Sequence, residues 1–116
     1  MALALVERIE RIGVDVKIKW PNDLLVDGQK LAGILPRLFF RGGKLRLLRV
    51  GVGLNVFNNV PKEGISLKQI IGDKTMNINF WSSEVLLAIE KSLDLVDNKD
   101  FLCSQVEQRL LSLIHI

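Results

Sequence analysis

Residues 17–35, KIKWPNDLLVDGQKLAGIL, constrain the fold more than any other stretch of this sequence. Pro21 lacks a backbone donor and restricts the residue before it, so a strand that reaches Trp20 ends there. Asp27-Gly28 is a strong two-residue hairpin signal, because both central positions of such a turn favour left-handed backbone. The stretch therefore predicts a strand, a turn and a tight hairpin in quick succession.

A second hairpin and several helices complete the predicted architecture. Residues 41–44, Arg-Gly-Gly-Lys, predict a turn between a strand over about 30–40 and another over 45–56. Pro36 inside the first of these strands indicates a sheet edge or a bulge. We therefore expect an α+β fold, an antiparallel or mixed β-sheet with helices packed on it. Helical spacing of apolar residues places these helices at 2–12, 67–71, 82–97 and 100–113.

The local patterns also predict which residues are buried or cap helices. Alternation over 14–20 predicts one buried strand face, formed by Val14, Val16, Ile18 and Trp20. Ser66 suits the N-cap of the 67–71 helix, and Ser82 or Asn79 suits that of the 82–97 helix. Leu86 is expected to widen the apolar stripe of the latter.

Composition limits the class of protein. The 116 residues are 48% hydrophobic and carry a net charge of +3, which suits one domain or part of one and is too weakly basic to predict nucleic-acid binding. The single cysteine, Cys103, excludes an internal disulfide and a multi-cysteine metal site. No apolar run approaches the roughly 20 residues that span a bilayer. We expect no metal site, no membrane contact and a cytoplasmic location.

The first candidate site is the turn at Asn22 and Asp23 together with Lys30. A carboxylate and a lysine that flank one hairpin can meet near its open end, and lysine suits a carboxylate or phosphate ligand. The structural alternative is that Asp23 caps the turn and Lys30 is simply solvated.

The second candidate is the strand over 50–56, whose two faces differ. Gly51, Gly53 and Asn55 share one face, and the glycines leave it bare, so that a ligand can approach the backbone closely. The alternative is that the glycines relieve crowding under a packed helix. Gly33, with Leu31 and Leu35 of the same parity, predicts a second bare patch. A strict strand would put Lys30 on the opposite face.

A third feature is the basic charge of the second hairpin. Its cations are Arg37, Arg41, Lys44, Arg46 and Arg49. A solvated face is the favoured interpretation, and an anionic partner is the alternative.

The motifs KWPNDLLVDGQKLAGIL and VGVGLNV, about fifteen residues apart, closely resemble the biotin protein ligase family. The segment VPKEGISLKQI also looks like the family's segment after the second motif, so the resemblance covers roughly residues 1–97. It implies a partial catalytic domain of the class II aminoacyl-tRNA-synthetase and biotin-synthetase type. Such enzymes activate biotin with ATP and Mg²⁺ as biotinyl-5′-AMP and transfer biotin to a lysine of a carrier domain.

The resemblance also implies roles for individual residues. Lys30 would reach the biotin carboxylate and the adenylate phosphate, where its charge offsets developing negative charge. Asp23 would lie near the phosphates and metal and help the attack by the carrier lysine. The remaining implied binding residues are Trp20, Pro21 and Asn22 at the turn, Gly33 and Leu35 for biotin, and Gly53 and Asn55 for the nucleotide.

The sequence departs from the family pattern in several places. The family's GRGRxxR-type loop and serine/threonine-rich strand, and its small C-terminal β domain, have no counterpart in these 116 residues. Pro36-Arg37 stands where many members have a polar or acidic pair. We therefore expect a single partial domain over 1–116 with low or no activity alone, whose partner would be the biotin carboxyl-carrier domain of acetyl-CoA carboxylase. The alternatives are a non-catalytic remnant that dimerises through strand edges or binds another partner, and, less favoured, a lipoate ligase-like protein.

Overall fold

Four antiparallel strands follow one another in both chain order and sheet order. A computed structural model describes residues 1–72 and 77–95. The strands are β1 (Lys17–Lys19), β2 (Asp23–Val26), β3 (Gln29–Arg41) and β4 (Lys44–Leu54), and the sheet order is β1-β2-β3-β4. The helices are α1 (Ala2–Glu10), α2 (Leu67–Ile71) and α3 (Ile78–Leu95). The expected α+β fold, an antiparallel sheet with helices packed on it, is confirmed.

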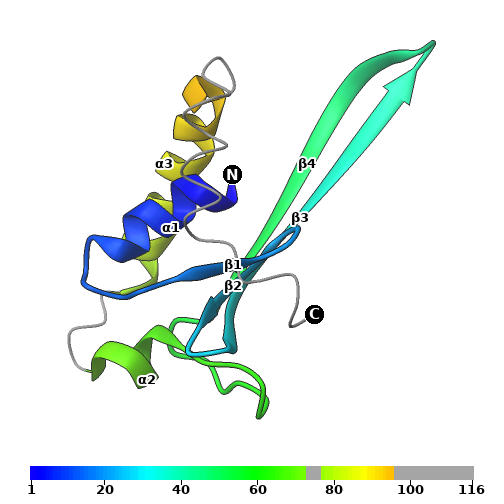
Figure 1. Cartoon of the computed structure of the whole chain (residues 1–116). Helices are drawn as coiled ribbons and strands as arrows, with labels where there is room; N and C mark the ends of the chain where they lie inside the picture. The colour runs from blue at the N-terminus through cyan, green and yellow to red at the C-terminus, as the bar shows by residue number, and fades with distance from the viewer. Residues whose placement is uncertain (73–76, 96–116) are drawn as a thin grey trace.

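Both predicted hairpin turns are present. Asp27 and Gly28 have φ values of 50° and 78°, and Gly42 and Gly43 have φ values of 59° and 75°. Left-handed backbone at both central positions matches the right-handed twist of the flanking strands. The second turn joins two long strands, so the β3–β4 hairpin extends away from the helices α1–α3 (Figure 1).

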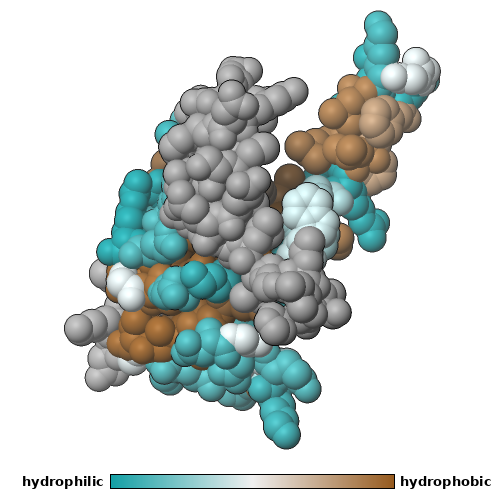
Figure 2. Space-filling model, viewed as in Figure 1, coloured by the Kyte–Doolittle hydropathy of each residue, from teal (hydrophilic) through white to brown (hydrophobic). Residues whose placement is uncertain are grey.

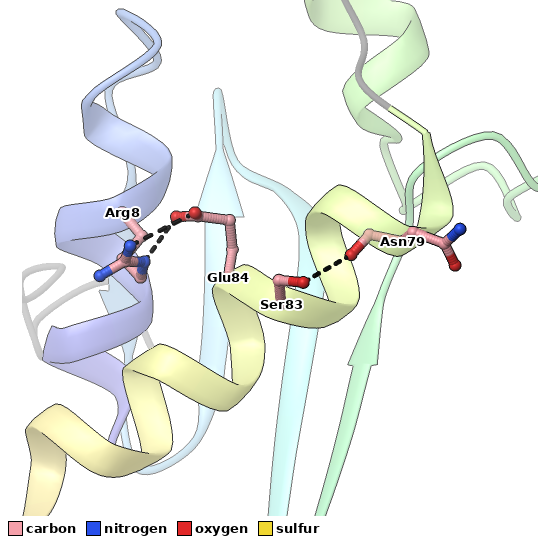
Figure 3. A network of polar contacts seen from close by, with 4 residues as sticks. All are labelled: Arg8, Asn79, Ser83 and Glu84. Carbon is pink, nitrogen blue, oxygen red and sulfur yellow. Dashed lines mark hydrogen bonds and ion pairs between the residues drawn. The ribbon is translucent and has the colours of Figure 1, made fainter.

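The helices cover one face of the sheet and form the core with it. Leu5 and Ile9 of α1 and Trp81 and Ala88 of α3 are almost fully buried against apolar residues of β1, β2 and the first half of β3. Arg8 of α1 donates to the Glu84 carboxylate of α3, which ties the two helices together (Figure 3). The other sheet face has no helix on it among the described residues, and we call it the open face.

The structure corrects several local predictions. Trp20 is not buried with Val16 and Ile18, because β1 ends at Lys19 and Trp20 is 65% exposed. The third helix begins at Ile78, earlier than predicted, and Asn77 caps it by accepting a hydrogen bond from the Phe80 N–H. Leu86 is exposed and does not widen the buried stripe.

Other predictions are confirmed or lie outside the described residues. Ser66 and Gln69 form a reciprocal capping box at α2, as the sequence predicts. The helix predicted over 100–113 and Cys103 lie outside the described residues. No helix among the described residues is long and apolar enough to cross a membrane.

Candidate functional site

A bulge in β3 builds the candidate site. Leu24 pairs with Ala32, but Leu25 pairs with Lys30, so Leu31 has no partner in the register. Leu31 and Ala32 are consequently both buried, and the alternation of faces shifts by one residue. The shift puts Lys30 on the same face as Gly33, whereas regular alternation would have put the two residues on opposite faces. Leu31 is buried and is therefore not part of the predicted bare patch.

The bulge brings Lys30 and Asp23 together over Gly33. Lys30 Nζ lies 3.3 Å from Asp23 Oδ1. A Cβ atom added at Gly33 would lie 3.2 Å from both Lys30 Cε and Nζ and 3.6 Å from Asp23 Oδ1. The glycine therefore leaves space for the Lys30 side chain to lie across the strand toward Asp23.

The site continues across the sheet as a row without side chains. Asp23 pairs with Gly33, and Gly33 pairs with Gly53 on β4. In the next row Leu35 pairs with Gly51. A Cβ atom at Gly53 would meet nothing within 4 Å, so no packed helix explains this glycine among the described residues. The arrangement is a bare stretch of backbone with an acid–lysine pair at one side.

The Asp23–Lys30 pair contributes little to stability. The two side chains are 36% and 52% exposed, and ion pairs this exposed are worth only about 0–1 kcal/mol. A lysine ammonium has three donors, and within residues 1–72 and 77–95 Asp23 is the only ion-pair partner of Lys30. The ammonium can therefore still bind an anionic ligand above the bare row.

The backbone of Lys30 is held by a segment that the sequence did not mark as part of the site. Its N–H donates to the Glu63 carbonyl at 2.8 Å, and its carbonyl accepts from the Ile65 N–H at 2.9 Å. The only sign of this segment in the sequence was the resemblance of VPKEGISLKQI. The segment fixes where the Lys30 side chain begins.

Asn55 joins the same hydrogen-bonding network. Its Nδ2 donates to the Lys30 and Ile65 carbonyls at 3.3 and 3.2 Å, and its Oδ1 accepts from Asn58 at 3.0 Å. Asn55, which the resemblance assigns to the nucleotide, thus links the end of β4 to the start of β3 through its side chain.

The turn residues 20–22 face a different part of the molecule. The Trp20–Pro21 peptide is cis. Trp20, Pro21 and Asn22 line an apolar cavity of about 430 Å³ that is also bordered by Met1 and Ile89 on the helix side of the sheet. The structure therefore groups Asp23, Lys30, Gly33, Leu35 and Gly53 on the open face and separates the turn from them.

The described residues contain no group of three or more His, Cys, Asp or Glu side chains that could hold a metal ion.

Comparison with known proteins places the chain in a family. The family model described as "Biotin/lipoate A/B protein ligase family" matches residues 1–55, which include every candidate site residue named above. The bifunctional ligase/repressor BirA of Bacillus subtilis is 36% identical over 98 residues, and biotin–protein ligase 1, chloroplastic, of Arabidopsis thaliana is 39% identical over 93 residues. The chain belongs to the biotin/lipoate A/B protein ligase family.

Solved structures of this ligase family agree with the fold. The apo structure of biotin protein ligase from Aquifex aeolicus matches 95% of the chain at 28% identity with a TM-score of 0.76. The Bacillus and Arabidopsis relatives match 78% and 76% of the length of this chain. The chain in turn spans only 51% of the Aquifex protein, 30% of the Bacillus relative and 24% of the Arabidopsis relative. The matched relatives are thus considerably longer proteins.

Proposed function

We propose that this chain forms part of the catalytic domain of a biotin–[biotin carboxyl-carrier protein] ligase. The observation that carries the proposal is the Asp23–Lys30 pair set beside the bare Gly33–Gly53 row on the open face. The names of the relatives support the biotin branch, and one solved relative is a biotin protein ligase in complex with biotin and ATP. A partial domain over 1–116 is the corresponding domain proposal.

The proposed reaction has two steps. A biotin carboxylate oxygen attacks the α-phosphorus of ATP, the bond to the β-phosphate breaks, and pyrophosphate leaves. An amine of the carrier lysine then attacks the acyl carbonyl, loses a proton, and releases AMP. Negative charge develops on the phosphate in the first step, so an ammonium held there lowers the barrier. Lys30 is the group on the open face that suits this role.

The positions of the other site residues suggest a separate role for each. Gly33, Gly53 and Leu35 let biotin and the nucleotide lie close to the backbone, and Leu35 adds apolar surface, since it is 60% exposed. Asp23 holds the Lys30 ammonium and can accept a proton from the attacking carrier amine. We propose Asn55 as a nucleotide-side residue that acts through its hold on the Lys30 backbone.

Mg²⁺ belongs to the proposal as a partner of ATP. Magnesium typically keeps several waters and binds through one or two carboxylates plus substrate phosphates. Asp23 is the carboxylate of the open face that fits this donor set, and the bound ion would neutralise phosphate charge.

A second candidate function is a non-catalytic module that associates with another polypeptide, including a second copy of itself. The exposed apolar residues of the β3–β4 hairpin favour it. In the catalytic proposal the partner is the biotin carboxyl-carrier domain of acetyl-CoA carboxylase, in the cytoplasm.

Calorimetric titration of the chain with biotin and ATP separates the two functions. The catalytic proposal expects roughly micromolar binding that Lys30→Ala weakens by about tenfold or more. Lys68→Ala is the matched control, because Lys68 is an exposed lysine on α2. Absence of heat at millimolar biotin and ATP, with the chain folded, would leave only the non-catalytic module.

A further inference from the structure

The side-chain amides of Asn55 and Asn58 meet just after the end of β4. They belong to a loop at the end of the molecule opposite the outer turn of the β3–β4 hairpin (Figure 1). The surface at this end is mainly hydrophilic (Figure 2). Asn58 is exposed, so hydrogen bonds rather than apolar packing orient its amide.

The backbone of Asn55 has little freedom. Its N–H donates to the Leu31 carbonyl at 3.0 Å, and its carbonyl accepts from the Leu67 N–H at 2.9 Å. These bonds tie Asn55 to β3 on one side and to α2 on the other. They leave open the orientation of the side-chain amide, which can turn over and exchange the places of its oxygen and its nitrogen.

Only one of these two orientations suits the Lys30 carbonyl. In the structure Asn55 Nδ2 donates to the Lys30 carbonyl at 3.3 Å and to the Ile65 carbonyl at 3.2 Å. Both partners are acceptors, so an amide oxygen in the place of Nδ2 would face two carbonyl oxygens. The Lys30 carbonyl would then keep only the bond from the Ile65 N–H. Turning this one amide would therefore weaken the hold on the residue that carries the proposed catalytic ammonium.

Asn58 selects the orientation that Asn55 needs. The Val56 N–H donates to Asn58 Oδ1 at 3.2 Å, and because a backbone N–H can only donate, it fixes which end of the Asn58 amide is the oxygen. The nitrogen at the other end donates to Asn55 Oδ1 at 3.0 Å and to the Asn59 carbonyl at 3.3 Å. A donor at this place requires the Asn55 oxygen beside it, which leaves Asn55 Nδ2 for the Lys30 carbonyl.

We propose that Asn58 is a positioning residue of the ligase site, which acts on Lys30 through the Asn55 amide. The proposal rests on the ligase function proposed above, in which the Lys30 ammonium faces the adenylate phosphate. The backbone bonds of Lys30 set where its side chain begins, and from there the ammonium reaches Asp23 across Gly33. A displaced backbone therefore moves the ammonium relative to the bare row beside it and lowers the affinity for an anion bound there.

Asn58→Asp is the sharpest variant, because it keeps the shape of the side chain and removes its donor group. One carboxylate oxygen can still accept from the Val56 N–H, and the other then faces Asn55 Oδ1. The Asn55 amide gains by turning over, which brings its oxygen against the Lys30 carbonyl. The loop stays attached to the start of β3 through the bonds of residues 62–64.

Titration of the 116-residue chain with ATP and biotin measures the effect on ligand binding. We expect Asn58→Asp to weaken binding about tenfold. Asn59→Asp is the matched control, because it adds the same charge at the next position and keeps the backbone carbonyl that accepts from Asn58. It should change binding less than about twofold. In an Asn55→Ala chain, Asn58→Asp should have no effect beyond that of Asn59→Asp, because the residue through which it acts is gone.

NMR of the chain without ligand separates this proposal from the ligase function. Asn58→Asp should shift the signals of the Asn55 side-chain amide, of Lys30 Cε and of the Gly33 N–H beside it, whereas Asn59→Asp should leave them in place. The remaining backbone signals show that each variant folds. If the unaltered chain binds neither ATP nor biotin, the ligase function fails, and these shifts alone decide whether Asn58 positions Lys30.

Three results would overturn the proposal. The first is that the signals of Lys30 and Gly33 do not move in Asn58→Asp. The second is that the two aspartate variants weaken ligand binding equally. The third is that Asn58→Asp keeps its full effect in the Asn55→Ala chain.

Discussion

At the scale of single residues, Gly53 and Gly33 have different surroundings despite being paired. A side chain at Gly33 would displace Lys30, whereas a side chain at Gly53 would enter open space. Gly53 has open space at its Cβ position and no positive φ, so neither crowding nor backbone conformation requires a glycine there. A glycine in a strand lowers the stability of the fold, because it loses more conformational entropy on folding than other residues do. We propose that a ligand which approaches the backbone explains the presence of Gly53.

Gly53→Ala tests that explanation without any ligand. We expect the free energy of unfolding to rise by about 0.4–1 kcal/mol, measured by denaturant unfolding, because the substitution restricts the unfolded chain. Gly13→Ala is the control: Gly13 has a φ of 86°, so the same change should cost about 1–2 kcal/mol. A loss of more than 1 kcal/mol at Gly53 would instead indicate that a packed neighbour covers this glycine.

At the scale of elements, the short helix α2 depends on contacts at its first turn. The N–H groups of Leu67 and Lys68 donate to the Asn55 and Val56 carbonyls, and that of Gln69 donates to the Ser66 hydroxyl. The start of α2 is therefore fixed to the end of β4, close to the residues that hold the Lys30 backbone. Its cap influences the candidate site through this connection.

Ser66→Ala should lower the free energy of unfolding by about 1–2 kcal/mol, because Ser66 is 2% exposed and the Gln69 N–H loses its acceptor. Thermal and denaturant unfolding measure the change. Ser82→Ala, at an exposed position on α3, should change stability by less than about 0.5 kcal/mol. Equal effects at the two serines would show that the cap does not support α2.

Elements with strong local signals were predictable from the sequence. Asp27-Gly28, Gly42-Gly43 and Ser66 each act through their own backbone or that of near neighbours, and all three were confirmed. The bulge at Leu31 was not predictable, because it depends on how β2 pairs with β3. The hold of residues 63–65 on Lys30 likewise joins distant parts of the chain. The sequence thus predicted that Asp23 and Lys30 could meet. Only the structure shows that Lys30 lies on the same face of the sheet as Gly33.

At the scale of the whole molecule, stabilising contacts concentrate at one end. The core lies between the helices and the inner part of the sheet. The outer part of the β3–β4 hairpin, which extends away from the helices (Figure 1), contributes mainly exposed residues. The Arg8–Glu84 pair lies in the well-packed part and joins the first helix to α3, across 76 positions of sequence. Both side chains are largely buried, at 17% and 13% exposed. Solvent therefore screens this pair far less than a surface ion pair.

A double-mutant cycle on Arg8→Ala and Glu84→Ala should give a coupling energy of about 1–3 kcal/mol that changes little between low and moderate salt. The reason is that two hydrogen bonds link the guanidinium to the carboxylate in a poorly hydrated position. The matched control cycle uses Asp15 and Lys17, which are 3.6 Å apart and 80% and 43% exposed. Its coupling should stay below about 0.5 kcal/mol and vanish with added salt. If the two cycles give equal values, the Arg8–Glu84 pair does not fix α1 to α3, and packing of Leu5 and Ile9 against the core alone holds the helices together.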